Sequence, residues 1–311
     1  MNTKYNQSMY NQTKYNQSTY IESNYFTFTT KDNVKLNVGY ACNKYKRSDK
    51  IIILIPGWSQ TIEQYKVIWN NPELLKHYSI YAIDMRGHGQ SEKVNYGYQV
   101  SRLAQDLYEF ISEYNLQNIT LMGHSLGCAI IWNYIQNYGE DNILNYIFID
   151  QSITELPLEG YSDELGSTLS WFRNEKELTL YDLCNKLKSS YGEKVRRVIM
   201  MQLFTPEWIS NNEEEFEYFY KQSSLLPLPY ASDLFLNHAM TDWRTLLPRI
   251  QNPTLVIGGT ESTTNYKSIL YQASIIPDCQ YYIFEEYGSH FMFIEDTETF
   301  IQVIMNFLLS L

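Results

Sequence analysis

A serine between two glycines is the first sign of chemistry in the chain. Gly123-His124-Ser125-Leu126-Gly127 follows an apolar run at 119–122 and opens a helical pattern at 126–138. This G-x-S-x-G spacing predicts a sharp strand-to-helix turn that raises the serine hydroxyl above the sheet edge, at a helix N-terminus. A hydroxyl held there is suited to nucleophilic attack on an acyl carbonyl. A capping serine between tight glycines is the alternative, but it predicts none of the partners considered next.

A serine hydroxyl of ordinary pKa needs a base, and the five histidines of the chain can be compared one by one. His290 lies in the loop Gly288-Ser289-His290, after the last apolar run and before the last helical pattern. This position matches the chain order serine, acid, histidine that accompanies such a turn. The other four lie at a strand border, in an Arg-Gly-His-Gly turn, beside the serine and in a helical segment: His77, His88, His124 and His238. We therefore predict His290 as the base, against the alternative of a surface loop histidine.

The acid that would orient the base has two candidates. Asp150 ends the apolar run 146–149, where its carboxylate would emerge at the same sheet edge as Ser125. Glu261 lies in the turn after the next run, 254–257, and Ser262 beside it stands where an aspartate would be expected. We favour Asp150 and keep Glu261 as the alternative acid. A third interpretation makes Asp150 only a local cap on the backbone.

Acyl transfer also needs donors for the developing oxyanion, each of which contributes roughly 2.7–4 kcal/mol. The amide of Leu126, next to the nucleophile, is one candidate. The turn Pro56-Gly57-Trp58-Ser59 follows another apolar run and offers the amide of Trp58. The indole of Trp58 would either wall the pocket or belong to the core.

Elements that alternate along the chain must position these residues. Apolar runs alternate with helical patterns, and this predicts an α/β fold with a mainly parallel eight-stranded sheet and helices on both faces. The first two strands form a hairpin around Lys31-Asp32-Asn33. Strands are predicted at 25–29, 35–41, 51–55, 79–83, 119–122, 146–149, 254–257 and 281–284, and helices at 62–76, 99–114, 126–138, 264–274 and 295–310.

The alternation breaks between 151 and 251, where only helical patterns occur, at 162–171, 178–188, 193–204 and 213–223. We interpret this segment as a helical cap inserted into an α/β core of residues 23–150 and 252–311. Residues 1–22 are predicted to be a disordered tail, because a pentapeptide repeat with almost no aliphatic side chains fills most of them. Its sequons at Asn6, Asn11 and Asn16 would matter only in an exported chain.

Composition excludes several classes of protein. The net charge of −11, with no basic patch, argues against nucleic-acid binding. No apolar stretch approaches the ~20 residues of a membrane span, and the polar N-terminus lacks the apolar region of a secretory signal. We therefore expect a cytoplasmic protein with a small-molecule substrate, while the oligomeric state has no signal in the sequence. The four cysteines have no metal-type spacing and are predicted to be buried thiols. No metal or organic cofactor is indicated.

With these features in place, and with Asp84-Met-Arg-Gly-His-Gly-Gln-Ser91, the chain from about 25 to 311 resembles the α/β-hydrolase superfamily. The resemblance implies that Arg86-Gly-His-Gly89 is a structural turn. A narrower similarity, carried by Gly57-Trp58, Tyr65-Lys66, Gly97-Tyr98-Gln99 and Asp150, points to the cofactor-independent 3-hydroxy-4-oxoquinoline 2,4-dioxygenases. Those enzymes usually have histidines where Leu126 and Ser59-Gln60 stand here.

The prediction is a serine hydrolase that cleaves a small or medium, largely apolar ester or related acyl compound through an acyl-enzyme. Ser125 would attack, His290 would carry the proton, and Asp150 or Glu261 would orient it. Aromatic residues of the cap, Trp171, Phe172, Phe204 and Trp208, are candidates for the acyl pocket. The alternatives are a cofactor-independent dioxygenase of the same fold, in which His290 removes a substrate hydroxyl proton, and a non-catalytic binding protein.

Overall fold

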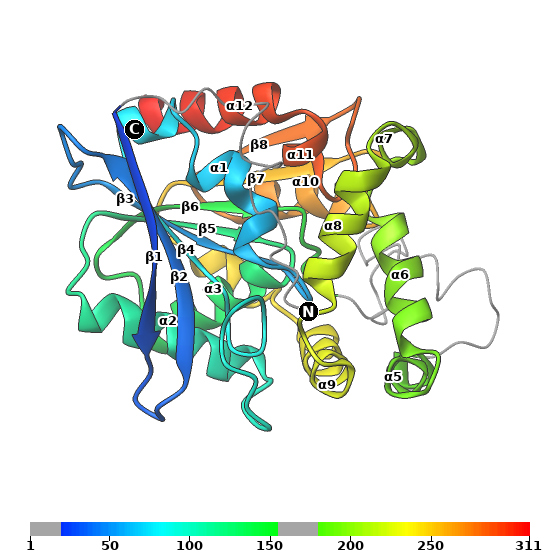
Figure 1. Cartoon of the computed structure of the whole chain (residues 1–311). Helices are drawn as coiled ribbons and strands as arrows, with labels where there is room; N and C mark the ends of the chain where they lie inside the picture. Colours follow the sequence, from blue (N-terminus) through cyan, green and yellow to red (C-terminus); the bar gives the residue numbers. More distant parts are fainter. Residues whose placement is uncertain (1–19, 155–179) are drawn as a thin grey trace.

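A computed structural model describes residues 20–154 and 180–311 of the chain. They form one eight-stranded sheet in the order β1-β2-β4-β3-β5-β6-β7-β8, with helices around it (Figure 1). The strands are β1 (Ile21–Thr29), β2 (Lys35–Asn43), β3 (Ile51–Ile55), β4 (Ser79–Ile83), β5 (Ile119–His124), β6 (Ile143–Ile149), β7 (Thr254–Gly259) and β8 (Cys279–Phe284).

The sheet is mainly parallel, as predicted. β1 and β2 form an antiparallel hairpin, β2 pairs antiparallel with β4, and every pairing from β4 to β8 is parallel. All side chains of β5 and β7 are buried, because helices cover both faces of a parallel sheet. The carboxyl ends of these strands therefore meet along one edge, where β5 leads into Ser125 and β6 into Asp150.

Helices cover the sheet on two sides. Figure 1 shows α2 and α3 on one side and α1, α11 and α12 on the other. The helices that connect or flank core strands are η1 (Ile62–Tyr65), α1 (Lys66–Trp69), η2 (Leu74–Lys76), α2 (Val100–Glu113), α3 (Leu126–Tyr138), η3 (Leu247–Arg249), α10 (Tyr266–Ile275), α11 (Met292–Glu295) and α12 (Thr297–Ser310).

The described part of the segment between β6 and β7 holds five α-helices and no strand. They are α5 (Leu180–Lys188), α6 (Gly192–Gln202), α7 (Pro206–Asn211), α8 (Glu213–Ser223) and α9 (Leu228–Ala239), grouped beside the sheet at right in Figure 1. The sequence analysis missed α7 and α9. The first has only six residues, and the second begins at prolines, with Pro227 as its N-cap and Pro229 in its first turn. The predicted helix at 162–171 lies outside the described residues.

Most predicted boundaries differ from the structure by one to three residues, and three differences are larger or change an element. The helix expected at 62–76 is broken into short turns, since Pro72 interrupts it and the Asn71 side chain accepts hydrogen bonds from Glu73 and Leu74 amides. The helix expected at 295–310 begins as two pieces, with Asp296 capping the second. β1 starts at Ile21, so the last residues of the predicted tail 1–22 belong to a strand, and residues 1–19 lie outside the described part.

The cysteines form no disulfide. All four are free thiols; Cys42, Cys128 and Cys184 are buried and Cys279 is partly exposed. Within the described residues, none of the helices has both the length and the apolar character needed to cross a bilayer.

Candidate active site

Ser125 lies at the turn between β5 and α3 with a left-handed backbone, φ 53°. Its amide donates to the Ile149 carbonyl at 2.8 Å, which fixes the turn to the neighbouring strand. The two glycines are required by close backbone contact. A Cβ on Gly127 would lie 2.1 Å from the Ile55 carbonyl oxygen, and a Cβ on Gly123 would lie 2.6 Å from the Gly127 carbonyl carbon. The motif therefore forms the tight turn that the sequence predicts.

His290 is paired with Asp150. Its Nδ1 lies 2.6 Å from Asp150 Oδ2, and the two side chains are almost fully buried. Burial raises the pKa of Asp150 above its ordinary value, and the hydrogen bond from His290 opposes that rise. The contact leaves the Nε2 of His290 as the ring nitrogen that faces away from the carboxylate. The structure thus brings together two of the predicted residues from β6 and from the loop after β8.

The alternative acid lies elsewhere. Glu261 is exposed, and its backbone amide donates to the Gly288 carbonyl at 3.0 Å. Ser262, at the position where an aspartate was expected, donates its hydroxyl to the carboxylate of Asp150. Thr264 adds a hydrogen bond to the Asp150 carbonyl at 3.2 Å. The turn after β7 therefore donates hydrogen bonds to Asp150 and does not itself supply the carboxylate. The spacing of residues along the chain could not predict this contact.

The turn from Pro56 to Ser59 follows β3 at the same edge. The Gly57 amide donates to Gln60 Oε1 at 2.8 Å, and the Ser59 amide donates to His88 Nε2 at 3.3 Å. The amides on either side of Trp58 are thus bound inside the protein. The Trp58 indole is buried and donates to the Ala231 carbonyl of α9 at 2.7 Å, so it joins the turn to the helical segment.

His88 holds the turn from Pro56 to Ser59 through its side chain. Its Nδ1 contacts the Arg86 carbonyl at 3.1 Å, and burial, with the positive charges of Lys93 and Arg196, lowers its pKa to about 4. The neutral ring can therefore accept the hydrogen bond from the Ser59 amide. His88 was predicted to be structural and not catalytic, and in the structure it makes hydrogen bonds within the protein.

A cluster of acidic residues contacts Arg86, which lies in the same turn as His88. Asp32, Asp106 and Glu109 place carboxylate oxygens within 4.8 Å of one another, a spacing that a metal ion could use. Two guanidinium groups already occupy the cluster: Arg86 contacts Asp106 at 2.6 Å, and Arg102 bridges all three acids. The two guanidinium groups offset most of the negative charge, so the cluster is an ion-pair network that anchors the Arg86 turn.

Aromatic side chains of the helical segment contact the His290 loop. Phe204 stacks on Phe291, next to His290, with ring centroids 4.5 Å apart, and on Trp208 at the same distance. Glu295 accepts hydrogen bonds from Ser289 and from Thr205. Trp171 and Phe172, the other predicted pocket residues, lie outside the described part of the chain.

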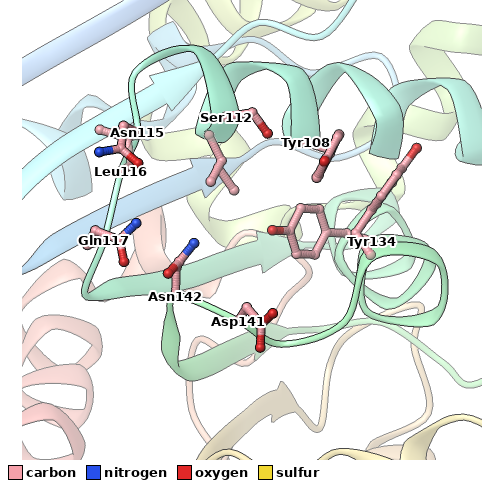
Figure 2. A pocket seen from close by; sticks show the side chains of 10 residues that line it. Tyr108, Ser112, Asn115, Leu116, Gln117, Tyr134, Asp141 and Asn142 are labelled. Atoms are coloured by element: carbon pink, nitrogen blue, oxygen red, sulfur yellow. The ribbon is translucent and has the colours of Figure 1, made fainter.

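A hollow of about 380 Å³ lies at the opposite edge of the sheet. It is lined by α2, α3 and the turns that precede β5 and β6, with Tyr108, Tyr134 and Asn142 around it (Figure 2). Gln117 on its wall comes just before β5, whereas Ser125 comes just after that strand. The hollow is therefore separate from the candidate site.

Three residues of the site were missed as functional by the sequence analysis. Gln60 and Tyr65 come from the stretch after β3 and His124 from the end of β5, and the three form one buried hydrogen-bonded group beside His290. His124 had been considered only as a base and rejected. No local pattern joins these residues, so no signal in the sequence marked the group.

Comparison with known proteins gives relatives of several activities. Ethanol acetyltransferase 1 of Wickerhamomyces anomalus is 31% identical over 156 residues, 49% of this chain and 38% of that protein. A non-heme chloroperoxidase of Burkholderia pyrrocinia is 29% identical over 115 residues, 36% of this chain and 39% of that protein. The chain thus spans well under half the length of these curated relatives.

Structural comparison agrees on the fold. An esterase from Exiguobacterium antarcticum superposes with a TM-score of 0.76 at 21% identity, covering 90% of this chain and 98% of that one. The family model described as alpha/beta hydrolase fold matches residues 50–297, which include the Ser125 turn, Asp150 and His290. The chain belongs to the α/β hydrolase fold family.

Proposed function

We propose that the protein is a serine hydrolase that cleaves a small or medium, largely apolar carboxylic ester or related acyl compound. The observation that carries the proposal is the buried contact of 2.6 Å between His290 Nδ1 and Asp150 Oδ2 at the sheet edge where Ser125 lies. A carboxylate that accepts from Nδ1–H holds the imidazole in the tautomer whose Nε2 can accept a proton.

The proposed reaction has two halves. Ser125 Oγ attacks the acyl carbon while His290 Nε2 takes the hydroxyl proton, and the same proton then goes to the departing alkoxide. The acyl group is left as an ester on Ser125. Water, deprotonated by His290, attacks this ester, and the carboxylic acid leaves as Ser125 regains its proton. Asp150 stays ionised and stabilises the imidazolium in both halves.

The oxyanion is proposed to bind to the amides of Leu126 and Trp58. Leu126 is the first residue of α3, so its amide adds to the positive end of the helix dipole. The amides of Gly57 and Ser59 hold the neighbouring turn in place through Gln60 and His88, which supports a preorganised Trp58 amide.

An apolar substrate is supported by the side chains next to His290. Phe204, Phe291 and Trp208 form a stacked group that joins the His290 loop to α6 and α7. We also propose that residues 151–251 act as a cap over the site. The helices α5–α9 are inserted in the chain between β6, which leads into Asp150, and β7, which leads into the Ser262 turn.

Transfer of the acyl group to a small alcohol is the second candidate activity, favoured by the 31% identity with an ethanol acetyltransferase. Both activities share the acyl-enzyme and differ in whether water or an alcohol accepts the acyl group. Product analysis with and without added ethanol separates them: free acid alone indicates hydrolysis, and ethyl ester indicates transfer.

A fluorophosphonate probe tests the proposal, because it reacts with a serine that has an active base. Rapid labelling of Ser125, lost in Ser125→Ala and strongly slowed in His290→Ala, is the expected result, together with turnover of p-nitrophenyl esters. Absence of labelling and of ester turnover in the native protein would overturn it. Oxygen uptake with hydroxyquinolones, run beside the ester assay, would then support the dioxygenase alternative.

A further inference from the structure

His124 lies directly before the candidate nucleophile and is fully buried. Its Nε2 is 2.9 Å from the backbone carbonyl oxygen of His290, and the two imidazole centroids are 4.4 Å apart. A carbonyl oxygen only accepts hydrogen bonds, so Nε2 of His124 must carry a proton and donate it. The contact joins the last residue of β5 to the loop that presents the proposed base.

The other ring nitrogen of His124, Nδ1, also has a hydrogen-bond partner. Burial, and the nearby His290, lower the pKa of His124 well below its ordinary value, so the ring is neutral and its Nδ1 is an acceptor. Tyr65 Oη lies 2.5 Å from this nitrogen, and burial raises the pKa of Tyr65, which keeps the hydroxyl protonated. The tyrosine therefore donates to Nδ1, so its single proton is not shared with Gln60 Oε1, which lies beside it. One tautomer of His124 satisfies the contacts to Tyr65 and to the His290 carbonyl.

The same group reaches the turn that carries Trp58. The Gly57 amide donates to Tyr65 Oη at 3.3 Å and to Gln60 Oε1 at 2.8 Å. Gln60, Tyr65 and His124 are all at most 1% exposed. Phe293 stacks on Tyr65 with ring centroids 4.8 Å apart and closes the group from the His290 side. The loop of the base and the oxyanion turn thus share one continuous buried chain of hydrogen bonds.

We propose that His124 is a positioning residue: it fixes the His290 backbone relative to Ser125 and, through Tyr65 and the Gly57 amide, relative to the Trp58 turn. The proposal rests on the proposed hydrolase function. Its effect falls on the chemical step, because displacement of a catalytic group by about 1 Å costs on the order of 10²-fold in rate. A neutral His124 also adds no positive charge next to His290 when that residue holds the proton.

Two variants of similar size separate a hydrogen-bonding role from simple packing. In His124→Gln the side-chain amide nitrogen can replace Nε2 as the donor to the His290 carbonyl, whereas His124→Leu has no donor. We expect His124→Leu to lower kcat for p-nitrophenyl acetate by about 10- to 100-fold with KM within about twofold, and His124→Gln to recover most of the loss. Equal kcat in the two variants, or a native kcat in His124→Leu, would overturn the proposal.

A second measurement keeps the proposal separate from the hydrolase function. Nitrogen-15 NMR of the imidazoles reports the tautomer and pKa of each histidine without any turnover. We expect His124 to stay neutral with its proton on Nε2, and the His290 signals to shift in His124→Leu but not in His124→Gln. If the native protein neither turns over esters nor reacts with the probe, the function fails while this spectrum still decides the contact. A His124 protonated on Nδ1 would refute the positioning role.

Discussion

Asp150 directly follows β6 and has a left-handed backbone, φ 50°, and its amide donates to the Ile257 carbonyl at 2.8 Å. This conformation is uncommon for a residue other than glycine and is tolerated where the surroundings determine it. Here it turns the carboxylate toward His290, with Ser262 donating to it from the turn after β7. The strain and the hydrogen bonds together give the acid one orientation.

The first prediction compares the two acids. Asp150→Asn should keep the size of the side chain but leave His290 in the wrong tautomer, with a loss of about 10⁴-fold in turnover. Glu261→Gln should change turnover less than about twofold, because Glu261 is exposed and makes its hydrogen bond through the backbone. The two variants are assayed on one p-nitrophenyl ester. A large loss confined to Glu261→Gln would show that the acid had been assigned wrongly.

The predicted residues of the site differ in how visible they were in the sequence. Ser125 and His290 could be found because each stands at a fixed place next to a strand and a helix. The choice between Asp150 and Glu261 needed the relative positions of two strand ends. The contacts of Gln60 and Tyr65 with His124 join two segments about sixty residues apart in the chain, and no periodicity predicts such contacts.

Among the elements, the turn from β5 to α3 depends on close backbone packing at Gly127. Its Cβ position lies 2.1 Å from the Ile55 carbonyl oxygen, and backbone atoms cannot move aside as a side-chain end can. The helix α3 and the strand β3 are thus in contact at the point where the Trp58 turn begins. Any increase in their separation would move Ser125 relative to that turn.

The second prediction therefore concerns this glycine. Gly127→Ala should lower the free energy of unfolding by about 1–3 kcal/mol or more and abolish fluorophosphonate labelling, because overpacking shifts the turn. Gly139→Ala is the matched control, since φ is +80° there and no atom lies within 4 Å of the added Cβ. It should cost about 1–2 kcal/mol through backbone strain alone and leave labelling intact. Denaturant unfolding and labelling rates check both variants, and unchanged labelling in Gly127→Ala would contradict the account.

The strands were predicted better than the helices for a physical reason. Buried strands of a parallel sheet are short unbroken apolar runs, and Ile51–Ile55 and Ser79–Ile83 were located to the residue. In the segment between β6 and β7, α7 has only six residues and both α7 and α9 begin at prolines, and these two helices were missed. The contact of α9 with the Trp58 indole through the Ala231 carbonyl could not be inferred from local pattern.

At the scale of the whole molecule, buried neutral histidines make stability depend on pH. The pKa of His88 falls from 6.5 to about 4 in the folded protein, chiefly because of burial. Between these two values the unfolded chain binds more protons than the folded one. The free energy of unfolding must therefore fall as pH drops through this window.

The third prediction follows from that sign. Acidification from pH 6.5 to about 4 should remove on the order of 3 kcal/mol of stability through His88 alone. His88→Gln keeps an acceptor for the Ser59 amide but does not titrate. Unfolding of the variant should therefore take up about one proton fewer in that window, and its free energy of unfolding should depend less steeply on pH. Urea unfolding at several pH values measures both slopes. Identical slopes in the variant and the native protein would show that His88 is not the source.

The proposed hydrolase mechanism requires Ser125 to form a covalent acyl intermediate. The most direct test is mass spectrometry of the protein quenched in acid during turnover of p-nitrophenyl acetate. We predict an acetyl group on Ser125 that accumulates in the native protein and is absent in Ser125→Ala, which should also lose ester turnover. Ester turnover at the native rate in Ser125→Ala, with no acetylated Ser125 in the native protein, would contradict it.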